Sequence, residues 1–327
     1  MKDQLYPLKF KPILKERIWG GDKLAKVLNK ETVSNSIGES WEISDVEGDT
    51  SVVINGRLAG KSLKELQNLL KDDLLGEKNY KTFQEKFPLL IKFIDAKQDL
   101  SIQLHPNDEI AAKRHNSFGK TEMWYVMQAD EGGNLIVGFK DDSNKEEYLE
   151  HLQHKSLLEI LNVDKVQKGD VYFIPTGRVH AIGAGVMLAE IQQTSDVTYS
   201  IYDWDRKDTR GNYRKLHTEL ALDAIDYKAQ KESRTTYNKT LNKQSNIVDC
   251  QYFTTNIVPI KGKIEIDHSN KDSFVIYMCV KGEATLHYGE GKVETVSYGE
   301  TILMPAILKE FSISSKNDSE LLEIYIK

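Results

Sequence analysis

The stretch that decides the fold is Gly169-Asp-Val-Tyr-Phe-Ile-Pro175-Thr-Gly177-Arg-Val-His180. Its short run of β-favouring apolar residues lies between a glycine and a Pro-x-Gly turn, which predicts a strand followed by a rigidly held histidine. Upstream, two further segments read Gln103-Leu-His105-Pro and Gly119-Lys120-Thr-Glu122. Together the three segments offer two imidazoles, a carboxylate and an amide oxygen. This mixed set of nitrogen and oxygen ligands is typical of a catalytic divalent metal ion with an open coordination position.

The bulk composition narrows the class of protein. The chain has 327 residues, of which 39% are hydrophobic, and a formal net charge of −6. That length suggests about two domains, and the apolar content is sufficient for a core. The acidic balance lacks the basic stripe of a nucleic-acid-binding protein, so we expect no nucleic-acid partner.

Cysteine usage and hydropathy indicate the compartment. Cys250 and Cys279 are the two cysteines, too few for a disulfide framework or a cysteine-based zinc site. Cys279 lies in an apolar run and is expected to be buried. The N-terminus lacks the apolar core of a signal peptide, and no stretch approaches about 18 apolar residues. We therefore expect a reducing, cytoplasmic location without membrane association; monomer and homo-oligomer both stay open.

Most of the chain is patterned as short strands separated by glycine-containing turns, which predicts a mainly β fold. Two segments instead have helical spacing, and each begins with a Ser-x-x-Glu pattern typical of a capping box: Ser62-Leu-Lys-Glu65 and Ser143-Asn-Lys-Glu146. A third helical stretch covers residues 217–225. The polar region that follows is the candidate linker between domains.

The predicted division of the chain follows from these patterns. We expect an N-terminal metal-bearing domain over residues 1–230, with helical insertions at about 61–86 and 143–160. Residues 231–246 form the predicted linker, and residues 247–327 form a metal-free C-terminal domain.

A weak internal repeat supports two related units. Gly169-Asp-Val-Tyr-Phe-Ile-Pro175 resembles Gly299-Glu-Thr-Ile-Leu-Met-Pro305, and Met123-Trp-Tyr-Val-Met resembles Phe274-Val-Ile-Tyr-Met. The first copy is longer by about one helix, the one that begins near Ser143. One β-barrel-like unit is therefore predicted to occur twice.

The repeat also serves as an internal control for the candidate ligands. In this alignment Glu122 matches Ser273, and His180 matches Glu310. His268 is the candidate counterpart of His105, with Ile266 in the place of Gln103. The second copy keeps the scaffold and lacks most ligands, which favours a functional role for them in the first copy.

Residues Gln103 and His105 are two positions apart, so on a strand both side chains point to the same face and can reach one ion. A single histidine is more often a hydrogen-bonded core or surface residue. That interpretation applies to five others: His115, His151, His154, His217 and His287.

At these residues the chain resembles a known family. The pattern Gly-x5-Pro-x-Gly-x2-His resembles the second motif of the cupin superfamily, whose members are jelly-roll barrels. The whole chain is similar to the short bacterial form of the type I mannose-6-phosphate isomerases. The resemblance rests on these segments: residues 10–21, Gly38-Glu-Ser-Trp-Glu-Ile-Ser44, residues 88–95, residues 99–108, residues 119–125, Val179-His-Ala-Ile-Gly183 and residues 193–206.

The resemblance implies a fold, an activity and a ligand set. The fold is expected to be mainly β, with two cupin (jelly-roll) β-barrel domains and a few inserted helices. The family's zinc ligands fall on Gln103, His105, Glu122 and His180, with one Zn²⁺ per chain, and its lysine falls on Lys120. The implied reaction is the interconversion of mannose 6-phosphate and fructose 6-phosphate. Proton transfer between C1 and C2 would pass through an enediolate, with Lys120 in charge stabilisation or proton transfer.

One position departs from the family pattern. The family's arginine follows Ser-Asp-x-x-Tyr, and here that position is Ser200. Serine cannot supply the positively charged, planar guanidinium group of an arginine. Arg206 is the nearest cation and a candidate substitute if the chain turns back, and Arg178 is another. For phosphate binding no glycine-rich phosphate loop is present, so Ser101, Lys120 and Arg178 are the candidates. Asp196, Asp203 and Asp205 are candidates for the general base, although each also fits a solvated loop.

Three functions compete at this point. The leading one is a zinc-dependent hexose-6-phosphate isomerase. The second is a non-catalytic or weakly active sugar-phosphate-binding protein, because the cupin fold hosts many functions. The third is a metal-dependent cupin oxygenase. Metal analysis separates the third from the first, and turnover separates the second.

Overall fold

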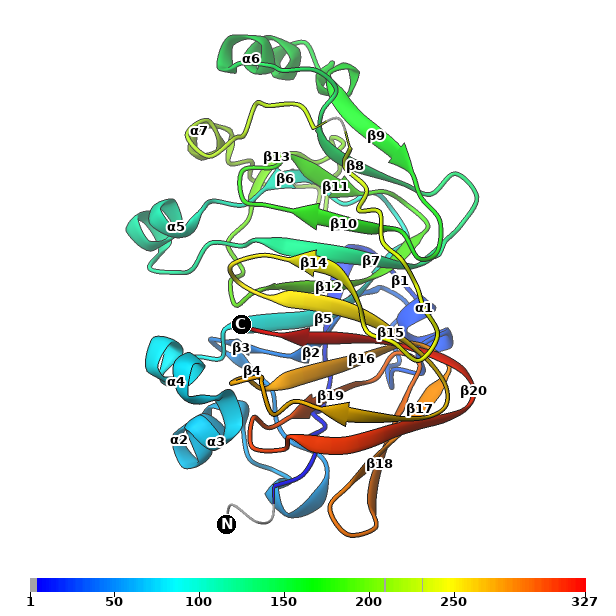
Figure 1. Ribbon diagram of the computed structural model, residues 1–327. Coiled ribbons are helices and arrows are strands. Elements are labelled where there is room, and N and C mark those ends of the chain that lie inside the picture. The colour runs from blue at the N-terminus through cyan, green and yellow to red at the C-terminus, as the bar shows by residue number, and fades with distance from the viewer. Residues whose placement is uncertain (1–4, 209, 231) are drawn as a thin grey trace.

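The computed structural model describes residues 5–208, 210–230 and 232–327. It is built mainly from β-strands with a few short helices, as predicted (Figure 1). Residues 1–4 of the predicted first domain, and residue 231 at the start of the predicted linker, lie outside the described residues.

The first large sheet has six strands and lies in the middle of the molecule (Figure 1). In spatial order its strands are β1 (Ile13–Gly21), β2 (Ile37–Ile43), β5 (Leu89–Ala96), β12 (Val186–Gln193), β7 (Glu122–Ala129) and β10 (Val171–Ile174). Every residue of β5 and β12 is buried, because other elements cover both faces of the sheet. Such strands are nearly continuous apolar runs rather than alternating ones.

The second sheet has five strands and carries part of the site. In order these are β13 (Tyr199–Tyr202), β6 (Ile102–Leu104), β11 (His180–Ile182), β8 (Asn134–Phe139) and β9 (Leu161–Lys165). An apolar layer that includes Trp124, Val137 and Leu188 packs between this sheet and the first.

The third sheet has seven strands and belongs to the C-terminal unit. These are β14 (Ser245–Asp249), β15 (Thr254–Asp267), β20 (Glu310–Tyr325), β16 (Val275–Lys281), β19 (Thr301–Met304), β17 (Glu283–Tyr288) and β18 (Lys292–Ser297). A small fourth sheet pairs β3 (Asp45–Val46) with β4 (Asp49–Thr50). Within the described residues, the strand pairings close none of these sheets into a barrel.

The helices lie at the periphery (Figure 1). They are α1 (Lys23–Lys26), α2 (Leu63–Leu70), α3 (Asp72–Leu75), α4 (Glu77–Phe83), α5 (Asp108–His115), α6 (Lys145–Gln153) and α7 (Thr218–Ala221), with 3₁₀ turns η2 (Gly56–Leu58) and η3 (Leu157–Glu159). The predicted insertions therefore contain α2 to α4 and α6, whereas α5 was not predicted.

The N-termini of helices α2 and α6 test the two predicted capping boxes. The Ser62–Glu65 box is confirmed, since the Ser62 side chain accepts from the Glu65 N–H and the Glu65 side chain accepts from the Ser62 N–H. The box proposed at Ser143 is wrong by one residue. The N-cap of α6 is Asn144, whose side chain accepts from the Glu147 N–H, while the Ser143 hydroxyl donates to the Glu147 carboxylate. The third helical stretch is also shorter than predicted, because α7 ends at Ala221.

The predicted linker is attached to both units. Arg234 donates to the Lys165 carbonyl at 2.7 Å, and Tyr237 donates to the Gly169 carbonyl at 2.6 Å. The last two linker positions, Ser245 and Asn246, already belong to β14. A large apolar cluster, in which the rings of Phe87 and Phe274 are 4.7 Å apart, joins the six-stranded sheet to the C-terminal sheet.

The internal repeat has a structural counterpart. Strand β10 pairs with β7, and β19 pairs with β16, both antiparallel. The register places Ile174 opposite Glu122, and Met304 opposite Val275. The counterpart of Glu122 is therefore Val275, two residues from the predicted Ser273.

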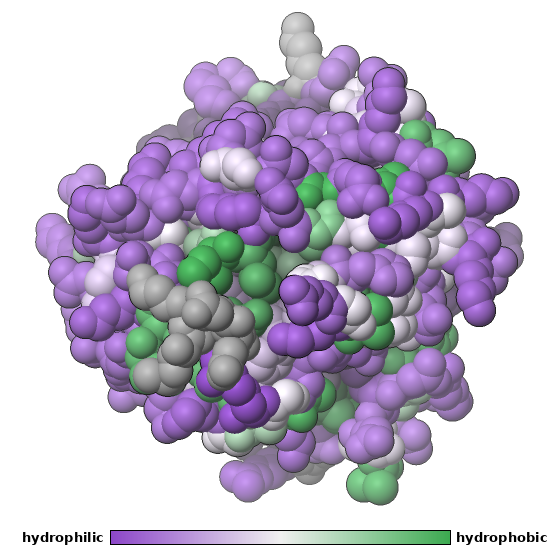
Figure 2. Space-filling model, turned by 60° about the horizontal axis from the view of Figure 1, so that its bottom comes forward, coloured by the Kyte–Doolittle hydropathy of each residue, from purple (hydrophilic) through white to green (hydrophobic). Residues whose placement is uncertain are grey.

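The face of the protein in Figure 2 is mostly hydrophilic, with apolar residues in separate patches.

Candidate metal centre

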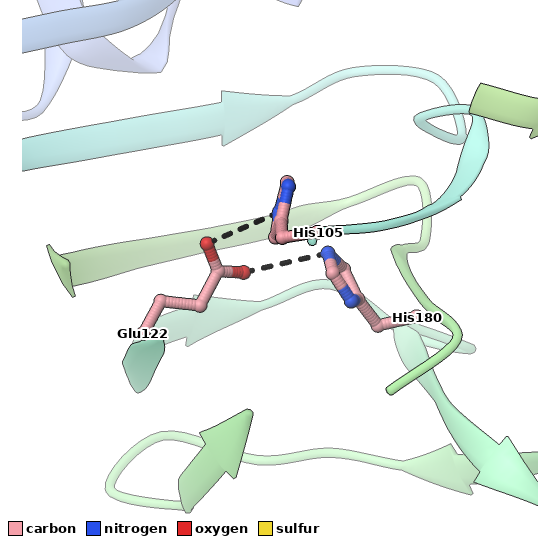
Figure 3. A group of neighbouring side chains, drawn as sticks. All are labelled: His105, Glu122 and His180. Carbon is pink, nitrogen blue, oxygen red and sulfur yellow. Dashed lines mark ion pairs between the residues drawn. The ribbon is translucent and has the colours of Figure 1, made fainter. Parts of the chain in front are cut away.

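Two sheets bring the candidate ligands together. Glu122 is the first residue of β7 in the six-stranded sheet, and His180 is the first residue of β11 in the five-stranded sheet. His105 directly follows β6, which pairs with β11 through Gln103 and His180. Each ligand thus lies at a strand end, where backbone pairing holds its position and the side chain remains free. Figure 3 shows the three side chains pointing toward a common centre.

The geometry of the three side chains suits one ion. His105 Nε2 lies 3.4 Å from Glu122 Oε2, and His180 Nε2 lies 3.4 Å from Glu122 Oε1. One ligand atom from each residue lies within 4.8 Å of the others, and all three residues are buried. Two imidazole nitrogens and a carboxylate oxygen are common ligands of zinc and similar divalent ions.

Hydrogen bonds to backbone carbonyls orient both imidazoles. His105 Nδ1 is 3.0 Å from the Val197 carbonyl, and His180 Nδ1 is 2.8 Å from the Arg178 carbonyl. When Nδ1 carries the proton for such a bond, the Nε2 lone pair faces the centre. This arrangement around the ligands is characteristic of metal-binding histidines.

Two buried polar atoms test whether an ion fits. His180 Nε2 and Glu122 Oε1 have no hydrogen-bond partner among the residues that the structure describes. Burial of such atoms without a partner is costly. Both atoms face the common centre, so an ion bound there would satisfy them. The residues present therefore fit a divalent metal.

The electrostatic setting keeps the ligands in the state that binds metal. Burial and the neighbouring Lys120 ammonium lower the pKa of His105 to about 4, and burial lowers the pKa of His180. Burial alone would raise the pKa of Glu122, but Lys120 and the two imidazoles hold it well below its usual range. At neutral pH the site therefore presents neutral imidazoles and an ionised carboxylate.

Gln103 and Lys120 lie beside this cluster. The Gln103 carbonyl oxygen accepts from the Ser101 hydroxyl at 3.3 Å, and the residue borders the same cavity as Lys120. The Lys120 ammonium donates to Glu122 Oε2 at 2.9 Å and lies 3.0 Å from His105 Nε2. Lys120 is therefore the charged group nearest to the ligands on the cavity side.

A cavity of about 410 Å³ opens next to these residues, between the two N-terminal sheets. Its floor includes Lys92 and Glu190, which are opposite each other on strands β5 and β12 of the six-stranded sheet. Lys92 and Glu190 line the cavity, as do Glu39 and Arg17. The residues that line the cavity are thus mostly polar or charged, which suits a polar ligand.

The charges on this floor are paired with one another. Lys92 Nζ lies 3.1 Å from Glu190 Oε2, and Arg17 Nε donates to Glu39 Oε1 at 2.9 Å. Burial would raise the pKa of Glu39, but Lys92 and Arg17 lower it to about 2. Burial would lower the pKa of Lys92, but Glu190 and Glu39 raise it. Glu39 and Lys92 are therefore both charged at neutral pH.

Sequence reasoning missed this floor, although a signal existed. Lys92 lies inside the apolar run of residues 88–95, and Glu190 lies inside the run of residues 186–191. A charged residue in the middle of a strand buried on both faces must have a partner or a ligand. Arg214 was also missed; it lines the cavity from a separate loop.

The other predicted site residues fall into two groups. Ser101 lines the cavity, and its hydroxyl lies 3.2 Å from that of Ser200. Arg206 and Arg178 are not among the cavity-lining residues. The chain does turn back at Trp204 and Asp205, which have left-handed φ angles of 57° and 53°.

The two arginines are held elsewhere. Arg206 donates to the Asp99 carbonyl at 2.6 Å and to the Asp203 carboxylate. Arg178 is buried, with its guanidinium 3.4 Å from the Asp226 carboxylate. Its backbone carbonyl is what contacts the site, through His180. The structure thus places neither guanidinium at the cavity.

Among the candidate bases, Asp196 alone lines the cavity. Asp203 accepts from Arg206, and Asp205 from Lys155 at 2.8 Å. The five histidines interpreted as ordinary residues are hydrogen-bonded to nearby groups or, for His154, exposed.

A mainly β scaffold that holds two imidazoles and a carboxylate around one point, beside a cavity, is typical of a cupin-type protein with a candidate metal centre. Comparisons with known proteins agree. Residues 7–135 match the family model "Phosphomannose isomerase type I, catalytic domain", and residues 243–324 match "Mannose-6-phosphate isomerase, cupin domain".

Relatives cover nearly the whole chain. It is 35% identical over 310 residues to mannose-6-phosphate isomerase ManA of Bacillus subtilis, covering 94% of this chain and 95% of that protein. It is 32% identical to a mannose-6-phosphate isomerase of Streptococcus mutans, covering 93% and 94%. A crystal structure of mannose 6-phosphate isomerase from Bacillus subtilis superposes with a TM-score of 0.87 at 30% identity, covering 99% of this chain and 100% of that one. The chain therefore belongs to the type I phosphomannose isomerase family and is an isomerase.

None of the helices in the described part of the chain is both long and apolar enough to cross a membrane.

Proposed function

We propose that this protein interconverts mannose 6-phosphate and fructose 6-phosphate with one zinc ion per chain. The cluster of His105, Glu122 and His180 carries the proposal, because it presents three metal-ligating atoms at one edge of a charged cavity. The names of the relatives supply mannose 6-phosphate, and fructose 6-phosphate is the partner sugar that the family resemblance implies. Gln103, on the strand paired with β11, completes the proposed ligand set.

The reaction moves a proton between C1 and C2 of the sugar through an enediolate, so negative charge develops on the substrate oxygens. A divalent ion held by the four ligands would supply Lewis acidity for that charge. The Lys120 ammonium, which donates to Glu122 Oε2 at 2.9 Å, contributes a second positive charge. Because Lys120 is buried, its charge stabilises a developing negative charge strongly.

We assign the proton transfer to Asp196. It lines the cavity, and its carboxylate has no ion-pair or hydrogen-bond partner among the described residues. Glu39 and Glu190 also line the cavity, but Arg17 and Lys92 hold them in ion pairs. A free carboxylate can approach a substrate proton, whereas a paired one is held by its partner.

The roles of three further site residues, the domain organisation and the cellular location are also proposals. The assignment of Arg206 to charge stabilisation, and of Ser101 and Arg178 to substrate binding, stays a prediction. The two units remain proposed jelly-roll domains with the boundaries given above. Both cysteines are free, which fits the proposed reducing, cytoplasmic location.

Metal-dependent turnover tests the function. Protein purified with its metal is analysed by mass spectrometry, dialysed against a chelator, and assayed with mannose 6-phosphate before and after zinc is restored. We expect about one zinc per chain, loss of activity with the metal, and recovery with zinc. His180→Ala should lose both metal and activity, while the exposed His154→Ala should lose neither. Metal-replete protein that binds mannose 6-phosphate without turnover would favour the sugar-phosphate-binding alternative. Stoichiometric iron would favour the oxygenase.

A further inference from the structure

The cations around the cavity differ in whether a carboxylate already neutralises them. Arg17 is 2.9 Å from Glu39, Lys92 is 3.1 Å from Glu190, and Lys120 is 2.9 Å from Glu122. Arg214 also lines the cavity, but within the described residues it has no ion-pair or hydrogen-bond partner. The guanidinium of Arg214 therefore keeps its hydrogen-bond donors for a ligand.

The backbone near Arg214 is held against the site. Three residues further along the chain, the His217 N–H donates to the Ser200 carbonyl at 2.8 Å. In return, His217 Nδ1 accepts from the Ser200 N–H at 3.3 Å. These two bonds attach the loop to β13, next to β6, which carries Gln103. The two bonds between His217 and Ser200 thus help to place position 214 beside the cavity.

The exposure of Arg214 indicates which part of a ligand it meets. Arg214 is exposed, whereas Lys92 and Lys120 are buried. A phosphate monoester is the most strongly hydrated end of a sugar phosphate, so it is bound at lowest cost near the cavity mouth. A planar guanidinium matches phosphate oxygens with paired hydrogen bonds. The sugar carbons could then extend inward to Lys120 and the metal ligands.

We propose that Arg214 binds the phosphate group of the substrate, and that this chain thereby supplies a cavity arginine from its 213–217 loop although position 200 is serine. The inference rests on the proposed function for the identity of the ligand. It adds a residue that sequence reasoning did not consider.

Binding measurements with matched variants test the inference. Arg214→Ala, Arg214→Lys and the control Arg210→Ala are compared with the wild type, all loaded with metal. Arg210 is an exposed arginine that precedes the 213–217 loop and does not line the cavity. Calorimetry measures the Kd of mannose 6-phosphate, fructose 6-phosphate and unphosphorylated mannose, and kinetics measure KM and kcat. Thermal melting confirms folding.

For Arg214→Ala we expect the Kd and KM of the sugar phosphates to rise roughly 10- to 100-fold, the range for a charge-assisted hydrogen bond. The affinity for unphosphorylated mannose should stay within about twofold, because mannose lacks the group that Arg214 binds. Arg214→Lys should raise the Kd and KM of the sugar phosphates by less than Arg214→Ala does, since lysine keeps the positive charge but lacks the planar guanidinium. Arg210→Ala should match the wild type.

The two proposals fail in different ways. If the wild type turns over mannose 6-phosphate and Arg214→Ala binds it equally well, the Arg214 inference is wrong and the isomerase function stands. An equal loss of affinity for mannose and its phosphate would also overturn it, by showing a structural role. If the wild type binds the sugar phosphate through Arg214 without turnover, the proposed function fails and the inference stands.

Discussion

Ser200 pairs directly with Gln103 across strands β13 and β6. Its hydroxyl is 3.2 Å from that of Ser101, which borders the cavity. Position 200 is therefore adjacent to the proposed ligand Gln103, and a long side chain there could reach the cavity.

This relationship predicts a rescue. Ser200→Arg combined with Arg214→Ala should lower the KM for mannose 6-phosphate to within about tenfold of the wild type, because one arginine fork replaces another. Steady-state kinetics measure the effect, and Ser200→Ala/Arg214→Ala is the matched control. A folded double variant no better than Arg214→Ala would show that position 200 does not reach the phosphate.

Lys120 is predicted to act on the chemical step rather than on metal binding. In Lys120→Met we expect kcat to fall by roughly 10²- to 10³-fold, the usual cost of removing one charge-stabilising donor. Zinc content should stay near one per chain, because the ligand atoms remain. Mass spectrometry and kinetics check both, with the exposed Lys113→Met of α5 as the control. Loss of zinc in Lys120→Met would instead indicate that the lysine organises the ligands.

Asp196 is predicted to carry the proton. Asp196→Asn should lower kcat by about 10²- to 10⁴-fold with little change in the Kd of mannose 6-phosphate. The acidic limb of the pH profile of kcat should disappear, since the amide does not titrate. Asp205→Asn, a change of an aspartate outside the cavity lining, should leave kcat within about twofold. An unchanged pH profile in Asp196→Asn assigns the proton transfer to another group.

Glu323 predicts how the stability of the C-terminal unit depends on pH. Its buried carboxylate accepts from Asn256 at 2.7 Å and from Lys271 at 2.9 Å, and lies 3.0 Å from His268 Nε2. Burial would raise the pKa of Glu323, but these groups lower it from its ordinary value of 4.5 to about 2. The lowered pKa means that the stabilisation is complete above about pH 4.5 and is lost as the pH falls toward 2.

The magnitude is on the order of 3 kcal/mol in the free energy of unfolding. Glu323→Gln should be less stable at pH 7, and its stability should decline less between pH 5 and pH 2, as measured by denaturant unfolding. Glu265→Gln, on an exposed position of β15, should retain the wild-type slope. A slope for Glu323→Gln equal to that of the wild type would exclude this carboxylate as the source.

The start of α6 gives a test of local structure. Because Asn144 is the N-cap, Asn144→Ala should cost about 1 kcal/mol of unfolding free energy. Ser143→Ala removes only a hydroxyl bond to the Glu147 side chain and should cost less than about 0.5 kcal/mol. Denaturant unfolding compares the two, and a larger effect at Ser143 would restore the original capping box.

The residues that sequence reasoning selected lie where local pattern and final structure coincide. His105, Glu122 and His180 each adjoin a strand end beside a turn, so spacing alone identified them as a group. Likewise, the Ser62–Glu65 cap is satisfied within four residues of chain. Such features depend on short-range geometry, which periodicity and turn chemistry report well.

The parts that were missed depend on pairing between distant strands. Lys92 and Glu190 face each other only because β5 and β12 are neighbours in the sheet. The distance of Arg206 from the cavity depends on a turn with two left-handed residues, which the amino-acid types there do not specify. The two-residue error at Ser273 arose because side chains two apart share a strand face, so the sequence pattern alone fits either register.

Strands β16 and β19 repeat the β7–β10 pair, yet Val275 stands where Glu122 does, and the exposed Glu310 begins β20 as His180 begins β11. The molecule thus contains a ready-made template for protein engineering. Val275→Glu and Glu310→His would be the first two substitutions for engineering a second metal site in the C-terminal unit. The native N-terminal site serves as its built-in reference for affinity and geometry.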